Sequence, residues 1–245
     1  MAERENDVHE RRRTFLVQAL TTGLLIGGAG WNARALASVF GKLPGKMPDG
    51  RSVFEIKGSV RINGQPLVQD TLITADSRIE TDAGSHAIIA VGDGAFIIRE
   101  KSVVEMSGRQ LLITGLQMLS GALLTVFGHR STEDAIKVTT PVATIGIRGT
   151  GFYTEATPDQ TYFCTCYGRT VITSTAGSGE SEEIVSKHHD APRIITAEAS
   201  GGRRIAPGPF KNHTDLELMT LEALCGRVVP FVISGDNYEG PRKSY

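Results

Sequence analysis

The feature that most constrains this chain is a succession of short apolar runs separated by turn-forming residues. From Val53 onward the runs recur about every ten residues, a spacing typical of β-strands joined by tight turns. Asn63-Gly64 and Asp93-Gly94 supply residues that accept the positive φ angles of hairpin turns. The runs show no strand–helix–strand spacing, so the sequence predicts an all-β fold rather than a parallel α/β sheet. The expected strands are 53–56, 60–62, 71–73, 87–91, 96–98, 103–106, 111–113, 135–140, 144–147, 151–155, 161–167, 169–173, 183–185 and 193–197.

One short α-helix is expected near the C-terminus. Thr214 and Glu217 form a Thr-x-x-Glu capping box, which satisfies the first backbone N–H groups of a helix. Leu218 and Leu221 follow at helical spacing, and Gly226 stands where helices commonly end. We therefore expect this helix to pack on the β-strands through its leucines.

The N-terminus carries the pattern of an export signal. Residues 11–16 contain Arg-Arg-x-Phe-Leu, and an uncharged stretch of about twenty residues follows, the length scale of a bilayer-spanning segment. Glycine and threonine keep this stretch only mildly apolar, as in twin-arginine signals, and Ala35-Leu36-Ala37 is a small-x-small cleavage site. We expect export to the periplasm by the twin-arginine route with cleavage after Ala37. An uncleaved signal would instead anchor the chain in the inner membrane.

Charge, cysteine content and motifs exclude several classes of protein. The chain has 26 Lys and Arg against 27 Asp and Glu, so it has no long-range positive field for nucleic acid. Its 3 cysteines are too few, and odd in number, for a disulfide framework. The sequence lacks a phosphate-binding loop, a serine-hydrolase elbow and a zinc-protease motif. We therefore expect a protein that is not an enzyme and does not bind nucleic acid.

Residues 140–152, Thr-Pro-Val-Ala-Thr-Ile-Gly-Ile-Arg-Gly-Thr-Gly-Phe, resemble the signature of the FecR domain of bacterial periplasmic sensor and anti-sigma regulators. Residues 79–84 resemble the family's threshold turn and residues 119–123 its glycine-centred strand. The likeness covers about residues 53–173. It implies a twisted β-solenoid or sandwich-like domain, to which the C-terminal helix is added. Gly149, Pro141 and Arg148 are expected to shape and pin the backbone rather than catalyse.

The resemblance also indicates how the chain is organised and what it does. The predicted units are a signal peptide over 1–37, a linker over 38–52, a FecR-like β domain over 53–175 and a C-terminal extension over 176–245. FecR proteins of iron-uptake systems relay receptor occupancy to a sigma factor across the inner membrane. About a dozen residues precede the apolar stretch, which favours a stand-alone exported domain over that relay. We expect a binding or signalling protein with a protein partner in the cell envelope, in sensing linked to iron; a scaffold for surface assembly is the other interpretation.

The chemically distinctive residues are Cys164 and Cys166 in a Cys-Thr-Cys sequence. Alternate residues of a strand face the same side, so both sulfurs are expected on one face. The FecR resemblance puts Phe163 and Thr165 on the inward face, which implies that both cysteines point outward. Cys225 lies on the apolar face of the expected helix and is assigned to the core.

Three interpretations of the cysteine pair remain open. In the first, the thiolates of Cys164 and Cys166 bind zinc, copper or iron together with His188 or His189, and export of an already folded protein favours this one. In the second, the thiols are redox-active and form a strained disulfide. In the third, both are inert core residues. Surface or structural roles are expected for the other histidines near turns or the helix start, His86, His129 and His213.

Overall fold

The computed structural model describes residues 43–129, 135–177 and 179–231. The predicted signal peptide, its cleavage site and the polar tail from Gly235 lie outside the described residues. Within these ranges, no helix combines the length and apolar character needed to cross a bilayer.

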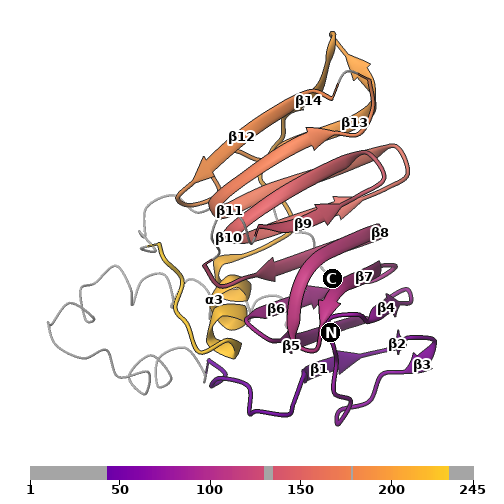
Figure 1. Cartoon of the computed structure of the whole chain (residues 1–245), viewed down its shortest axis with the longest axis vertical. Helices are drawn as coiled ribbons and strands as arrows, with labels where there is room; N and C mark the ends of the chain where they lie inside the picture. Colours follow the sequence, from indigo (N-terminus) through magenta and orange to yellow (C-terminus); the bar gives the residue numbers. More distant parts are fainter. Residues whose placement is uncertain (1–42, 130–134, 178, 232–245) are drawn as a thin grey trace, which may run out of the picture.

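The described residues form a β protein with one short helix, as the sequence predicts. The strands build one 14-stranded sheet, and the helix follows the last of them (Figure 1). In chain order the elements are β1 (Val53–Lys57), β2 (Val60–Ile62), β3 (Gln65–Pro66), β4 (Arg78–Thr81), β5 (His86–Val91), β6 (Gly94–Ile98), β7 (Val103–Arg109), β8 (Leu112–Val126), β9 (Ile136–Thr139), β10 (Ala143–Ala156), β11 (Gln160–Ser174), β12 (Ser181–Ser186), β13 (Arg193–Ser200), β14 (Arg203–Pro207) and α3 (Asp215–Leu224).

The sheet is strongly curved. Its main path runs β14-β13-β11-β10-β9-β8-β7-β4-β2-β3, while β1, β5 and β6 branch from β8, and β12 pairs with β11. Neighbouring strands are antiparallel except for the parallel pair β8 and β9. The result is a five-stranded barrel with additional strands, so the expected solenoid or sandwich architecture is not clearly present.

Two long strands, β10 and β11, each change their partner halfway along. The first half of β10 pairs with β9 and the second half with β8, with a register shift between Arg148 and Gly151. In the same way β11 pairs first with β13 and then with β12. The bend in β10 falls within the sequence that resembles the FecR signature, where Gly149 adopts φ 63°, a conformation that favours glycine.

Several strands predicted from the sequence differ from those in the structure. The separate runs expected at 144–147 and 151–155 are the two halves of β10, and those at 161–167 and 169–173 are the two halves of β11. The run at 71–73 is not a strand, because Ile73 is buried with its N–H donated to Ser52 Oγ. Gly201 and Gly202 form the hairpin turn between β13 and β14.

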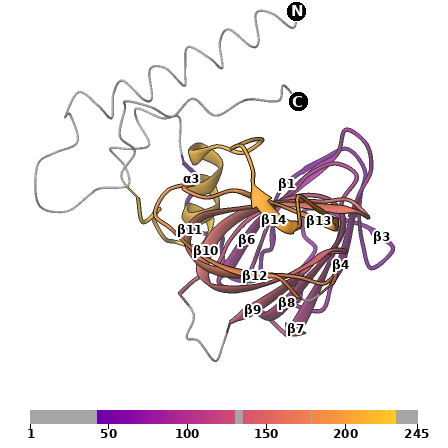
Figure 2. The same cartoon turned by 90° about the horizontal axis from the view of Figure 1, so that it is seen from above.

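Two apolar clusters lie on opposite sides of the curved sheet. The main core includes Phe152, Phe163 and Ile145 and is enclosed by the curve. The second cluster includes Tyr153, Tyr162 and the leucines of α3, which pack on the outer side (Figure 2). Adjacent residues of one strand thus enter different clusters, as the period-two geometry of a strand requires.

Replacing Gly151 by alanine is expected to destabilise the fold by about 1–3 kcal/mol, the usual cost of overpacking. A Cβ at this position would lie 2.5 Å from the ring of Tyr167, which is itself buried and bonded to Glu222. Urea unfolding followed by circular dichroism measures the change.

Gly146→Ala is the matched control, because Gly146 lies on the same strand and a Cβ there meets no atom within 4 Å. It should change stability by no more than about 0.5 kcal/mol. Equal free energies of unfolding for the two variants would contradict the assigned packing.

Candidate functional site

Cys164 and Cys166 lie on β11 and share one face of the strand, as the strand period predicts, and this face points away from the main core, as the FecR resemblance implies. Phe163, the residue before Cys164, points into the main core, whereas both cysteines belong to the second cluster. This outer face is covered, since both cysteines are 0% exposed. Helix α3 and the segment before it cover this face. No disulfide joins the cysteines.

His189 is brought to the cysteines by a tight loop after β12. Its backbone N–H donates to the Cys166 carbonyl at 2.8 Å, and its φ of 55° is in the left-handed region, where non-glycine residues are uncommon. Asp190 holds the loop by accepting the backbone N–H groups of Lys187 and His188 at 2.7 and 3.3 Å. The ring is thereby turned inward, with Nδ1 3.6 Å from Cys164 Sγ.

His213 also joins this group, although the sequence assigned it a surface or structural role. It is buried, and its Nε2 lies 3.0 Å from His189 Nδ1. Its other nitrogen, Nδ1, lies 2.7 Å from the Lys211 carbonyl, and its ring stacks on Tyr153 at a centroid distance of 4.7 Å. Because a carbonyl only accepts, the hydrogen of His213 is on Nδ1 and the lone pair on Nε2.

Four side chains therefore converge in one buried place. One ligand atom from each lies within 4.8 Å of the others. Thiolate sulfur and imidazole nitrogen are the donors that bind zinc and other borderline or soft ions. The members of this group, called the Cys2His2 cluster below, are Cys164, Cys166, His189 and His213.

His188 takes a different position from the one expected. Its Nε2 lies 2.9 Å from Asp215 Oδ1, the same oxygen that His189 Nε2 approaches at 3.2 Å. Its ring stacks on Phe231. Burial alone would raise the pKa of the Asp215 carboxyl, but the hydrogen bonds from both histidines outweigh it and lower the pKa to about 2. His188 thus lies on the outer side of Asp215, which is the first residue of α3.

The cluster favours one ionised thiol. Burial tends to raise the pKa of Cys164, yet hydrogen bonds from Cys166 and the two histidines hold it well below its usual value. For Cys166, burial and the neighbouring Cys164 raise the pKa. Burial lowers the pKa of His189, but its bonds to Asp215 and Cys164 outweigh this and raise it. The site therefore stabilises a negative sulfur beside a positive charge.

The segment that carries His213 is held on the sheet by polar contacts around the cluster. Tyr162 Oη donates to the Pro209 carbonyl at 2.8 Å, and Lys211 Nζ lies 2.7 Å from Glu155 on β10. Burial would raise the pKa of Glu155, but bonds from Lys211 and other donors lower it. Arg99 Nη2 contacts the Asn212 carbonyl at 2.8 Å and Glu217 of α3 at 3.0 Å. The Thr214–Glu217 capping box predicted from the sequence is formed.

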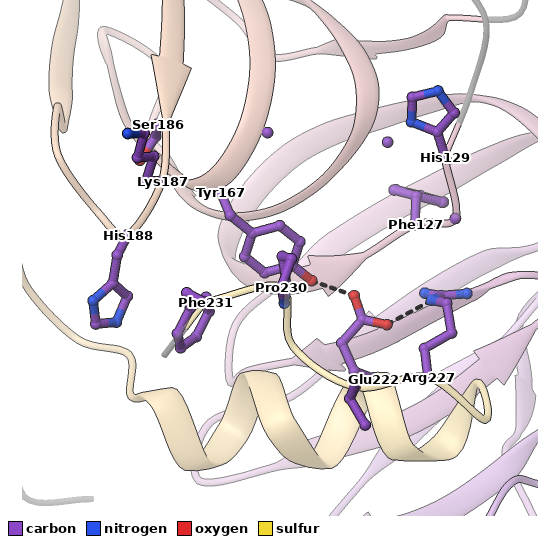
Figure 3. A pocket seen from close by; sticks show the side chains of 14 residues that line it. Phe127, His129, Tyr167, Ser186, Lys187, His188, Glu222, Arg227, Pro230 and Phe231 are labelled. Carbon is purple, nitrogen blue, oxygen red and sulfur yellow. Dashed lines mark hydrogen bonds and ion pairs between the residues drawn. The ribbon is translucent and has the colours of Figure 1, made fainter. Parts of the chain in front are cut away.

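A pocket of about 770 Å³ is lined by Tyr167 and His188, which are next in sequence to the cluster residues Cys166 and His189 (Figure 3). His188 and Phe231 line one side, and Tyr167 bonds to Glu222, which pairs with Arg227 at 2.6 Å. Cys164 and His189 do not line this pocket. A nucleophilic cysteine needs access to its substrate, so the pocket does not favour a Cys–His catalytic pair.

In the native protein as purified, iodoacetamide is expected to leave Cys164 and Cys166 unmodified. The low pKa of Cys164 favours reaction, but its complete burial denies the reagent access. Mass spectrometry of the peptides should detect both modifications after unfolding in urea. Modification of Cys164 in the native state at the rate of an exposed thiol would contradict this burial.

Two crystal structures of a "putative anti-sigma factor" from Parabacteroides distasonis ATCC 8503, at 1.65 and 2.50 Å resolution, are similar to this chain with a TM-score of 0.42 and 14% identity. Each alignment covers 54% of this chain, which spans 58% of the length of the other. A comparison with curated proteins found no match. Residues 77–169, which include β10 and both cysteines of the cluster, match the family model described as FecR protein.

Proposed function

We propose that this chain is an exported regulatory protein that acts by binding another protein of the cell envelope. The FecR match over residues 77–169 carries the proposal and supports a regulatory rather than an enzymatic role. The arrangement of the site is consistent with it, because the clustered thiols and imidazoles are buried rather than presented to a substrate. The family resemblance makes iron-responsive sensing the first process to examine.

The proposed location is the periplasm, reached by the twin-arginine route. The Arg-Arg-x-Phe-Leu pattern of residues 12–16 supports it, as does the small-x-small site at 35–37. This route exports folded proteins, so a buried cluster assembled from distant segments would be complete before the chain crosses the membrane. Cleavage after Ala37 would release the chain from the membrane.

Deleting the gene is expected to change a defined set of transcripts, which the wild-type chain restores. An Arg12→Lys/Arg13→Lys variant should fail to restore them and should remain in the cytoplasm, because the paired guanidinium groups are the export determinant. Arg11→Lys is the matched control, since it keeps that pair. RNA sequencing and immunoblots of periplasmic and cytoplasmic fractions measure both effects.

Unchanged transcripts in the deletion strain, together with turnover of a substrate by the pure protein, would overturn the regulatory proposal. Restoration by the export-defective variant from the cytoplasm would overturn the proposed location.

Metal binding is the second candidate function. It is favoured by one observation, the convergence of two sulfur and two nitrogen ligand atoms within 4.8 Å in a buried place. Burial of inert cysteines accounts for Cys164 and Cys166, whereas metal binding also accounts for the two imidazoles that lie beside them.

Elemental analysis of protein purified from the periplasm is expected to find zinc, copper or iron. A Cys164→Ser/Cys166→Ser variant should lose that metal, because serine hydroxyls do not replace thiolates for soft ions. Cys225→Ser is the control, since Cys225 lies outside the cluster. Absence of metal from both the wild type and the control would exclude this function.

A further inference from the structure

We propose that the Cys2His2 cluster is a closed site for one zinc-type ion, and that the ion fastens the C-terminal segment 209–231 to the β-sheet. The inference rests on the metal-binding function proposed above and makes it specific. Of the two histidines expected as alternatives, His189 is in this cluster and His188 is not, and His213 is an additional ligand.

The distances fit a tetrahedral ion. Zinc lies about 2.3 Å from a thiolate and about 2.0–2.1 Å from an imidazole nitrogen, so its ligands are about 3.6 Å apart for sulfur and nitrogen and about 3.3 Å apart for two nitrogens. Cys164 Sγ and His189 Nδ1 are 3.6 Å apart, and His189 Nδ1 and His213 Nε2 are 3.0 Å apart. These two distances are close to those of a tetrahedral ion, and all four ligand atoms lie within 4.8 Å of one another.

The outer hydrogen bonds of the two imidazoles aim their lone pairs at each other. His213 donates Nδ1–H to the Lys211 carbonyl, and His189 presents Nε2 to the Asp215 carboxylate. Such partners are typical around metal-bound histidines, where they set the tautomer and orient the ring. The two facing nitrogens are 3.0 Å apart, so the space between them holds either a proton, in an N–H···N hydrogen bond, or an ion that both lone pairs bind. In the proposed site the ion, shared with the thiolates, replaces that proton.

The ligand set indicates the kind of ion and its role. Thiolate and imidazole favour zinc, copper(I) or iron over magnesium and calcium, which prefer oxygen. All four ligands are buried protein side chains, and four protein ligands are typical of structural zinc sites, whereas catalytic sites leave one position open. The ion is therefore assigned a structural role.

The ligands come from three separate places in the chain. Cys164 and Cys166 lie on β11, His189 in the loop after β12, and His213 in the segment before α3. An ion bound by all three adds its binding free energy to the docking of that segment. Without it, polar contacts such as Arg99 with Glu217 and Lys211 with Glu155 remain. Loss of the ion should thus loosen segment 209–231 while the sheet stays folded.

His213→Ala should weaken zinc binding by more than about 100-fold, beyond the usual effect of losing an outer partner of a metal ligand. His188→Ala is the matched control, because His188 is an adjacent imidazole that contacts Asp215 from the outer side. It should bind zinc nearly as the wild type does. Competition with a chromophoric chelator measures both affinities on periplasmic protein that has been stripped and reloaded with zinc.

Two measurements on the wild type do not depend on a variant that folds. Cobalt(II) substitution should give the intense visible bands of tetrahedral coordination and a sulfur-to-cobalt charge-transfer band. Hydrogen exchange should become faster in 209–231 after chelation, with β4 to β8 unchanged.

The outcomes separate this inference from the function on which it rests. If the wild type binds no metal, the metal-binding function itself fails. If His213→Ala binds zinc as tightly as the wild type, or His188→Ala loses it equally, metal binding survives and the proposed ligand set is wrong. Weak octahedral cobalt bands, two ions per chain, or unchanged exchange in 209–231 would also overturn the closed site or its fastening role.

Discussion

The contact between the C-terminal segment and the outer face of β10 and β11 is the interaction on which the candidate site depends. That face carries Tyr153, Tyr162 and the two cysteines, all buried by the segment and α3. A helix of 10 residues is only marginally stable in isolation. Its capping box contributes about 1 kcal/mol, so most of its stability has to come from packing Leu218 and Leu221 in the second cluster, where α3 lies against β6 and β8.

The same contact determines the electrostatics of the site. Ionised sulfur is costly to bury unless opposite charge or hydrogen bonds compensate it. Here the imidazole of His189 provides that compensation and is itself oriented by Asp215. Asp215 lies in the first turn of α3, where the helix dipole favours a negative charge. One carboxylate therefore stabilises the helix start and orients two histidines, which couples the docking of α3 to the charge state of the cluster.

The curved strands β10 and β11 contribute to both faces of the sheet. β10 and β11 contribute to both apolar clusters, with Phe152 and Phe163 in the main core and Tyr153 and Tyr162 in the second cluster. Gly149 and Gly151 allow this geometry, the first by its positive φ and the second by its contact with Tyr167. Gly149 and Gly151 of the FecR-like sequence are thus explained by backbone shape and close packing rather than by chemistry.

Local patterns in the sequence determined the all-β class, most strand positions, the capped helix and the shared face of Cys164 and Cys166. Each of these follows from interactions between residues near one another in the chain: alternation, turn chemistry and capping. The sequence could not show that two neighbouring apolar runs belong to one long strand. A glycine between them is equally typical of a bend within a strand and of a turn between two strands.

Only the tertiary structure decided that the cysteines are buried, that His189 rather than His188 joins them, and that His213 completes the cluster. Cys166 and His213 are joined by docking of a segment far along the chain, and the choice between adjacent histidines depends on one loop with a left-handed residue. The period of a strand predicts which residues share one face of the sheet, but it does not predict which other segments pack on that face. The sequence alone therefore determined the direction of the sulfurs, and the docked C-terminal segment determined the surroundings in which their chemistry takes place.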